Sequence, residues 1–366
     1  MDITFVVTDQ RKAHEGVVRP FINFAKAFEG KYEVSFLLLN CSGDFSDFLG
    51  KSRFQVVVCN NQKKIIQEIE RLNPKVVFVD DDLKRLRLAH SIKKLTGAKT
   101  ICYVQILYGS HSIASCFDFS SLTLKKKLLF VPIKYVPFAF FSNRYAKLLK
   151  TFDLVIANSK ITATFLHSLY NVEVSGIVYP PVNTDIFLSS DQKAGQEATL
   201  YLGSNLGDSK KDFVIKIIAK ITESGYLANL FGNAKMASEI VSEPNKLVVY
   251  HSNLSDVDLA KMYSRSKLTI CPQKWEQFGL VPVESLSCGT PVLAFNCMGF
   301  QETIAATSGW LANNEADFLH LLEDALKKKE KLPFRELRNT AVKEFSIDAS
   351  GKVLGELLEK YINQKI

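Results

Sequence analysis

The segment WEQFGLVPVESLSCGTPVLAF, residues Trp275–Phe295, says more about the fold than any other part of this 366-residue chain. Pro282 suits the first turn of a helix, where its missing N–H is not needed, and Gly289 suits the left-handed position just past a helix end. The PVLAF run that follows is typical of a buried strand. A helix that begins beneath a glycine turn presents free N–H groups and a positive dipole end, which together can bind phosphate.

Two glutamates accompany this predicted phosphate site. Glu276 lies in the turn with Phe278 and Gly279, and Glu284 lies eight positions later, one turn or more into the predicted helix. Carboxylates can bind hydroxyl groups, so a pair beside a phosphate site can hold the hydroxyls on each side of a diphosphate. A nucleotide-activated sugar has that arrangement of groups.

The segment resembles the signature of glycosyltransferase family 4, whose members are retaining enzymes with the GT-B fold. The family pattern is E-x-F-G-L-x-x-x-E-x-x-x-x-G-x-P-V. The matching positions are Glu276, Phe278, Gly279, Leu280, Glu284, Gly289, Pro291 and Val292. The resemblance is nearly continuous from about residue 157 to residue 312, whereas the N-terminal part matches only in outline. It implies an α/β protein with two Rossmann-like lobes facing across a cleft and a C-terminal helix that crosses back to the N-terminal lobe.

The composition is that of an ordinary globular protein of two-domain length, with 47% hydrophobic and 23% charged residues. Seven cysteines without CxxC or metal-site spacing favour free thiols in a reducing compartment. The first residues do not resemble a signal peptide, and no apolar run reaches the roughly 18 residues of a spanning helix. The net charge of +8 is modest, and we expect no nucleic-acid partner.

Short apolar runs alternate with helical patterns in both halves of the chain, which favours two parallel, doubly wound sheets. The predicted strands are Ile3–Thr8, Val34–Asn40, Gln55–Cys59, Val76–Val79, Thr100–Val104, Leu154–Ala157, Thr199–Gly203, Leu227–Phe231, Leu247–Tyr250, Leu268–Cys271 and Pro291–Ala294. Pro180 and Pro181 interrupt the pattern. We therefore expect an N-terminal acceptor-binding lobe over 1–180, a C-terminal nucleotide-sugar-binding lobe over 181–345, and a returning helix over 346–366.

Residues 124–150 interleave basic and aromatic side chains without an acidic residue. Cations can lie on anionic lipid while rings occupy the interface, so this segment predicts a peripheral membrane contact. The alternative is a solvated basic helix joined to a segment that packs under the N-terminal lobe.

By the resemblance, Glu276 is the catalytic-site carboxylate that holds the hydroxyls of the donor sugar. The backbone N–H groups that approach sugar and phosphate would belong to Gln277, Phe278, Gly279 and Leu280. Glu284 would bind the ribose of the nucleotide.

The family usually neutralises the diphosphate with an Arg after a Gly-ended strand and a Lys some five residues later. This chain offers Gly203 but no Arg there, and Lys210 and Lys211 follow in a longer loop. Lys211 matches the helix start best, with Lys210 as the alternate. No metal is implied, because no Asp-x-Asp or His cluster lies near the motif. The three adjacent acids Asp80–Asp82 are interpreted as a solvated loop after a strand.

On the acceptor side, Gln105 occupies the position of a family His, and His111 is the candidate catalytic histidine in its place. Gly16 alone fills the position of a glycine-rich turn in the family.

The leading interpretation is a retaining glycosyltransferase that moves a hexose from a nucleotide-diphosphate sugar to a lipid-linked glycan acceptor at the cytoplasmic face of a membrane. It would need no cofactor beyond that donor. Two alternatives stay open: a soluble glycosyltransferase that acts on a small acceptor, and a non-catalytic partner subunit of another transferase.

Overall fold

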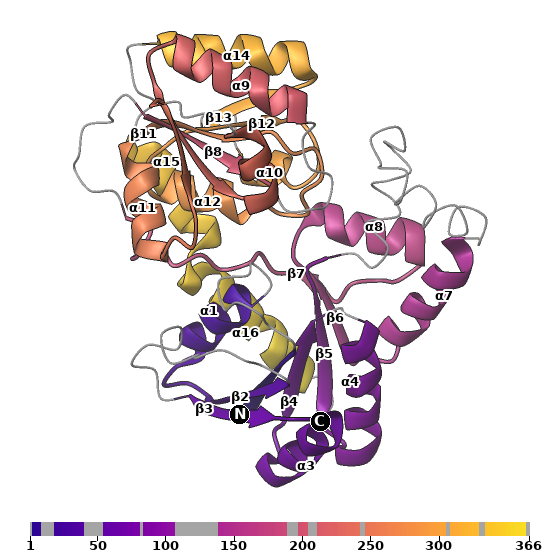
Figure 1. The fold of residues 1–366 in the computed structure, drawn as a ribbon. Helices are drawn as coiled ribbons and strands as arrows, with labels where there is room; N and C mark the ends of the chain where they lie inside the picture. The colour runs from indigo at the N-terminus through magenta and orange to yellow at the C-terminus, as the bar shows by residue number, and fades with distance from the viewer. Residues whose placement is uncertain are drawn as a thin grey trace. The chain divides into compact units, whose positions relative to one another are not determined.

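The computed structural model of this chain describes residues 2–8, 18–39, 54–80, 83–106, 138–188, 197–203, 211–241, 246–304, 308–328 and 334–363. These residues form two compact units, each built around its own parallel sheet (Figure 1). The first unit contains the described residues up to Pro181 together with those from Ile347 onward, and the second runs from Val182 to Ser346.

The sheet of the first unit has the strand order β3-β2-β1-β4-β5-β6-β7, with all strands parallel. Its strands are β1 (Asp2–Thr8), β2 (Glu33–Leu39), β3 (Gln55–Cys59), β4 (Val76–Asp80), β5 (Lys99–Val104), β6 (Leu154–Ala157) and β7 (Gly176–Ile177). The order reverses at β1, which pairs with β2 on one side and with β4 on the other. This is the Rossmann arrangement that the sequence pattern predicts.

Helices cover both faces of this sheet (Figure 1). The helices on one face are α3 (Gln62–Leu72), α4 (Leu83–Thr96), α7 (Phe138–Leu149) and α8 (Lys160–Tyr170). The helices on the other face are α1 (Arg19–Phe28) and α16 (Ile347–Asn363). The aromatic core beneath α1 includes Phe5, whose ring lies 5.0 Å from that of Phe78 and 5.2 Å from that of Phe36.

The last helix, α16, packs on α1, which confirms the predicted return of the C-terminal helix to the N-terminal unit. Tyr32 donates a 3.0 Å hydrogen bond to Glu359 of this helix, and the Tyr361 hydroxyl donates to Asp153 at 3.1 Å. The two helices approach so closely that a Cβ added to Gly351 would lie 2.3 Å from the Cβ of Ala27. Only a glycine fits this crossing.

We expect Gly351→Ala to destabilise the first unit by roughly 1–3 kcal/mol, because α16 must move away from α1 to admit the new methyl group. Thermal unfolding would measure the loss. The double variant Gly351→Ala with Ala27→Gly restores the space and should recover most of the stability. A single variant as stable as the wild type would show that this crossing is not tightly packed.

The sheet of the second unit has the order β10-β9-β8-β11-β12-β13 and is also parallel. Its strands are β8 (Glu197–Leu202), β9 (Leu227–Gly232), β10 (Val248–His251), β11 (Ser266–Cys271), β12 (Val292–Phe295) and β13 (Gly309–Ala312). The order reverses between β8 and β11, as in the first unit. Both predicted Rossmann-like sheets are therefore confirmed.

The faces of this second sheet differ in chemistry. The apolar face packs against α9 (Lys211–Glu223), α10 (Ala234–Ile240) and α14 (Glu315–Lys327). The other face carries hydroxyl groups, and Ser285 donates a 2.8 Å hydrogen bond to Thr269 of β11. Ser285 belongs to α12 (Leu280–Ser287), so α12 lies on this hydroxyl-bearing face. The remaining helices are α11 (Asp256–Arg265), α13 (Phe300–Thr303) and α15 (Phe334–Phe345).

Arg338 of α15 fixes the carboxyl end of α12. Its guanidinium group donates to the carbonyl of Ser287 at 2.8 Å and to those of Phe187 and Thr184 at 3.1 Å each. The rigid guanidinium group thereby connects the first residues of this unit to the helix that follows the glutamate turn.

Candidate functional site

The turn that contains Glu276 follows β11 at the point where the second sheet changes direction. β11 pairs with β8 through Ile270 and Leu200, so the carboxyl ends of these two strands lie next to each other. In open parallel sheets, ligands bind outside the carboxyl ends of the strands at such a reversal. The fold therefore places the predicted donor residues at the position where a nucleotide is expected.

Two glycines set the geometry of this turn and its helix. Gly279 has φ +96° and is the N-cap of α12, and Gly289 has φ +72° just after the C-cap Cys288. Side chains other than glycine rarely adopt these conformations. The predicted helix start and helix end are both confirmed.

The backbone of the turn surrounds the Glu276 carboxylate. The N–H groups of Gln277, Phe278 and Gly279 donate hydrogen bonds to it. Burial raises the pKa of this carboxyl above its ordinary value, although these N–H groups and the amide of Gln273 act in the opposite direction. The side chain is half-buried. The result is a partly desolvated carboxylate bordered by amide donors. The carboxylate can accept a hydrogen bond from a hydroxyl, and a phosphate oxygen can replace it as the acceptor of the N–H groups.

Two carboxamides beside Glu276 are buried without completing their hydrogen bonds. Gln273 is 3% exposed, and neither its oxygen nor its nitrogen has a partner of good geometry among the described residues. Gln277 is 8% exposed, and its Nε2 likewise has no partner in the described part of the chain. An unsatisfied buried polar group costs about 1–3 kcal/mol, and a missing ligand is one explanation for it. Sequence reasoning gave no role to Gln273.

Glu284 lies in the interior of α12 and is 1% exposed. The hydroxyl of Tyr263, on α11, donates to its Oε2 at 3.3 Å. The structure therefore places the second glutamate of the predicted pair in a defined, buried position rather than on the surface. Its predicted contact with ribose stays a prediction.

A second loop packs against the glutamate turn. The N–H of Gly299 donates to the carbonyl of Glu276 at 2.8 Å. A Cβ on Gly299 would lie 2.6 Å from the backbone of Gln277 and of Phe278. Sequence reasoning missed this contact, because the two segments are more than twenty positions apart and only the glycine itself gives a signal.

The predicted diphosphate ligands follow β8, the neighbour of β11. Gly203 is buried at the carboxyl end of β8, and Lys211 is the exposed first residue of α9. The Lys211 ammonium lies 3.9 Å from the carboxylate of Glu239. The alternate, Lys210, lies outside the described residues. Gly203 therefore lies at the same sheet reversal as Glu276, and Lys211 begins the helix that follows β8 in the described part of the chain.

Of the predicted acceptor-side residues, the structure describes Gln105. It follows β5, is 6% exposed, and its carbonyl accepts from the side chain of Asn158 at 3.3 Å. Asn158 in turn accepts from Ser159 and Thr162, the residues that begin α8. Gly16 and His111 lie outside the described residues, and their roles stay predictions.

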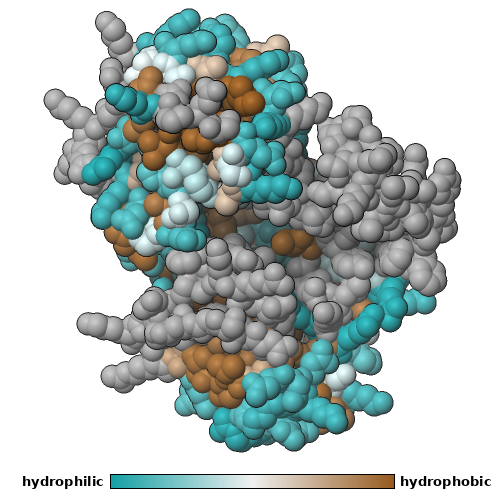
Figure 2. All heavy atoms as spheres, in the orientation of Figure 1, coloured by the Kyte–Doolittle hydropathy of each residue, from teal (hydrophilic) through white to brown (hydrophobic). Residues whose placement is uncertain are grey.

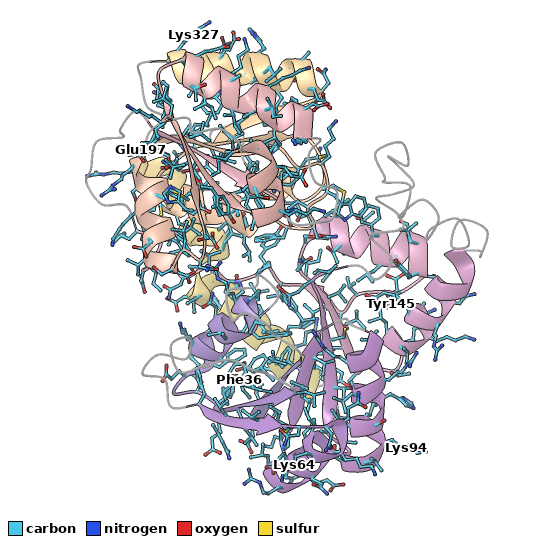
Figure 3. All side chains as sticks on the ribbon, in the orientation of Figure 1. Phe36, Lys64, Lys94, Tyr145, Glu197 and Lys327 are labelled. Carbon is cyan, nitrogen blue, oxygen red and sulfur yellow. The ribbon has the colours of Figure 1, made fainter. Side chains whose placement is uncertain are left out.

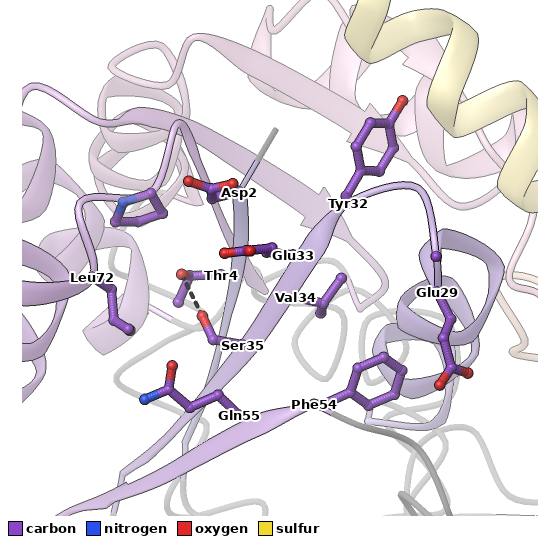
Figure 4. Close-up of a pocket in the computed structure, with 12 residues that line it drawn as sticks. Asp2, Thr4, Glu29, Tyr32, Glu33, Val34, Ser35, Phe54, Gln55 and Leu72 are labelled. Carbon is purple, nitrogen blue, oxygen red and sulfur yellow. Dashed lines mark hydrogen bonds between the residues drawn. The ribbon is translucent and has the colours of Figure 1, made fainter.

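The first unit also has a hollow of about 560 Å³ at the amino ends of its strands (Figure 4). Thr4 and Ser35 in its lining satisfy each other through a 2.8 Å hydrogen bond. Because ligands of such sheets bind at the carboxyl ends, this hollow is at the wrong edge for the predicted chemistry.

A family model described as "Glycosyl transferases group 1" matches residues 200–343, which include Glu276, Glu284 and Lys211. Residues 200–343 are a group 1 glycosyl transferase domain. The match begins in β8 and ends in α15, so this glycosyl transferase domain coincides with most of the second unit.

The chain is also similar to curated proteins. A D-inositol 3-phosphate glycosyltransferase of Mycobacterium sp. (strain JLS) is 27% identical over 202 residues, which are 48% of this chain and 45% of the relative. An uncharacterized 41.2 kDa protein in the cps region of Klebsiella pneumoniae is 27% identical over 227 residues, 58% of each chain. The matches thus span about half the length of these curated relatives.

Solved structures match the whole chain. Anabaena Alr3699/HepE, in complex with UDP and glucose, aligns with a TM-score of 0.74 and 15% identity over 98% of this chain and 100% of that chain. Sucrose-phosphate synthase from Thermosynechococcus elongatus aligns with a TM-score of 0.72 and 14% identity over 99% of each. At such identities the likeness concerns the fold, and the chain has the two-lobed GT-B fold of glycosyltransferases.

Proposed function

We propose that this chain is a retaining glycosyltransferase that transfers a hexose from a nucleotide-diphosphate sugar to an acceptor hydroxyl. The observation that carries the proposal is the desolvated Glu276 carboxylate among backbone N–H groups at the sheet reversal, with Glu284 buried in the helix that follows. Amide donors placed where charge develops stabilise a leaving phosphate, and a carboxylate orients the sugar hydroxyls. The Anabaena structures with UDP and UDP-glucose support a nucleotide sugar as donor.

In the proposed reaction, the bond between the anomeric carbon and the diphosphate oxygen breaks as the acceptor oxygen bonds to the same face of that carbon. The proton of the acceptor hydroxyl passes to the leaving phosphate. Lys211, at the start of α9, would offset the charge of the diphosphate. The chain would need no metal for this step.

We expect a nucleotide sugar to raise the unfolding temperature of the wild-type protein. UDP-glucose, GDP-mannose, ADP-glucose and dTDP-glucose would be compared, with free glucose as the control. A ligand at one hundred times its dissociation constant stabilises the folded state by about 2.7 kcal/mol. If none of the four shifts the transition, the transferase proposal is wrong.

The acceptor class has two candidates. A lipid-linked glycan agrees with the predicted membrane contact. A small phosphorylated acceptor is favoured by the mycobacterial relatives, which are named for D-inositol 3-phosphate. Radiolabelled transfer to each acceptor type, with whichever donor stabilises the protein, separates them.

The membrane contact would involve α4 and α7, which pack side by side on one face of the first unit. Neither helix contains an acidic residue. Their exposed basic residues, with Lys150 just beyond α7, are Arg87, Lys94, Arg144, Lys147 and Lys150. Tyr145 is buried while Lys94 points outward (Figure 3), and hydrophilic residues gather on this side (Figure 2). Residues 124–137 lie outside the described part of the chain. None of the helices in the described part is long and apolar enough to span a bilayer.

We expect the triple variant Lys94, Lys147 and Lys150→Glu to bind vesicles of anionic phosphatidylglycerol at least tenfold more weakly than the wild type. Each basic residue near an anionic surface contributes about 1 kcal/mol. The matched control reverses the exposed Lys216, Lys235 and Lys246 of the second unit, which gives the same net charge. Equal losses in both variants would contradict a contact through α4 and α7. A positive result would support peripheral binding to an anionic membrane surface.

A further inference from the structure

Gln273 lies in the short segment between the end of β11 and the glutamate turn. β11 ends at Cys271, and Glu276 follows five positions later. The side chain next to Gln273, Lys274, points outward, where it lies 3.6 Å from Glu315 and 4.7 Å from the centre of the Phe295 ring. Gln273 itself is turned inward and is 3% exposed.

The hydrogen-bonding capacity of the Gln273 carboxamide is only partly used, by an interaction with the Glu276 carboxylate that lacks good geometry. A Gln side chain offers two N–H donors and one acceptor oxygen. Neither Nε2 nor Oε1 has a partner of good geometry among the described residues, although the amide lies beside the Glu276 carboxylate. An apolar side chain would be less costly at such a buried position, so the amide is best explained by a group that arrives with the ligand.

We propose that Gln273 is a positioning residue for Glu276 and a determinant of donor-sugar recognition. With the donor bound, its Nε2 donates to the Glu276 carboxylate, and its Oε1 accepts from a hydroxyl of the sugar. This inference rests on the proposed function of the site and names the part of the substrate, the neutral polyol of the sugar, that the carboxamide recognises.

A neutral amide suits that role better than a second charge would. It orients the carboxylate without neutralising it, and it can pair with a hydroxyl that both donates and accepts. Gln277, one position after Glu276 in the sequence, offers a second amide nitrogen without a partner in the described part of the chain. The glutamate is therefore flanked in sequence by two buried carboxamides.

The ionisable groups near Glu276 do not take over the interaction of the Gln273 amide with its carboxylate. Cys271, on β11, is kept neutral because burial, with Glu276 and Glu284, raises the pKa of its thiol. Glu284, on α12, adds negative charge. Lys274 lies near Glu315, and the Cys297 thiol, with a pKa raised by burial to about 11, donates to the Lys274 carbonyl. Among these neighbours, the Gln273 amide and the backbone N–H groups are the donors that lower the pKa of Glu276.

The test uses Gln273→Met, which keeps the length and the apolar stem but removes the amide. Binding of UDP-glucose and UDP, and of GDP-mannose and GDP, would be measured by calorimetry. We expect the variant to bind the nucleotide sugar roughly tenfold more weakly, which corresponds to the loss of about one hydrogen bond to a neutral hydroxyl. It should bind the free diphosphate within about twofold of the wild type. The acid limb of the kcat/KM profile should move to higher pH, because Glu276 loses a group that favours its ionised form.

The matched control is Ser308→Ala. Ser308 is 1% exposed, its Oγ has no partner among the described residues, and it precedes β13 at the amino end of the sheet. This variant should leave sugar affinity and pH profile unchanged. Gln273→Asn, which keeps an amide, should recover part of the sugar affinity.

The outcomes separate the two proposals. A wild-type protein that none of the four nucleotide sugars stabilises would refute the proposed function. A wild-type protein that binds a nucleotide sugar, with a Gln273→Met variant that keeps both its preference for the sugar over the diphosphate and its pH profile, would refute the inference and leave the function intact. A Gln273→Met variant that weakens sugar and diphosphate equally would also overturn it, since that result indicates a structural role.

Discussion

Glu276→Gln is expected to reduce sugar transfer by roughly 10²–10³-fold, the size of effect seen when a group aimed at the reacting centre is removed. The carboxylate lies among the N–H groups of Gln277, Phe278 and Gly279. Glutamine keeps the shape but exchanges one acceptor oxygen for a donor, which faces those N–H groups with like polarity. Initial rates with saturating donor would measure the loss.

The same variant should unfold at a nearly unchanged temperature, because the like polarity of the new amide and the N–H groups lowers stability while removal of a buried charge raises it. Burial raises the pKa of Glu276, so its ionised form is less favourable in the folded state than in the unfolded chain. A raised carboxyl pKa makes the folded state relatively less stable as pH rises through that value, and a neutral side chain removes this cost at pH 7. Glu344→Gln, an exposed position on α15, is the control and should change neither property. A Glu276 variant with wild-type turnover would exclude the carboxylate from the reaction.

The sequence predicts the second unit well because its elements are local. Helix α12 is bracketed by Gly279 and Gly289, and both glycines adopt the left-handed conformations that the predicted turn and cap require. The strand of β11 was expected over Leu268–Cys271 and runs from Ser266. Apolar runs and glycines at turns and helix ends are signals that extend over only a few positions, so they can be recognised in a single sequence.

Short strands were not predicted. β7 has two residues, Gly176–Ile177, and β13 has four, Gly309–Ala312. Each lies at the edge of its sheet and pairs with one neighbour, β7 with β6 and β13 with β12. Both begin with a glycine, a residue depleted in strands, so neither has the uninterrupted apolar run by which the four-residue strands β6 and β12 were predicted.

The parts of the site that sequence reasoning missed depend on contacts between distant segments. Gln273 is an ordinary polar residue in the sequence, and its importance comes from burial beside Glu276. Arg338 is one of many basic residues until its contacts with the Ser287 and Thr184 carbonyls are seen. Glu276 and Glu284 could be predicted because a family pattern fixes their spacing along the chain.

Gly299→Ala is expected to lower transfer by about 10²-fold and to destabilise the second unit by roughly 1–3 kcal/mol. The backbone of Gly299 has φ −62°, which alanine adopts without strain, so the effect is purely one of space. A Cβ there would lie 2.6 Å from the carbonyl carbon and oxygen of Gln277 and from the Cα of Phe278. These are main-chain atoms that cannot rotate away, so the turn that presents N–H groups to Glu276 must shift.

A shift of that turn should affect chemistry more than stability, because donor and carboxylate must meet within a fraction of an ångström. The control is Gly355→Ala on α16, where the nearest atom to a new Cβ is Cε1 of Phe28 at 3.9 Å, an ordinary contact. Alanine there favours the helix by up to about 1 kcal/mol and should leave transfer unchanged. Rates and thermal unfolding of both variants would be compared. If Gly299→Ala were as active as Gly355→Ala, the close approach of the Gly299 loop would not determine the position of the glutamate turn.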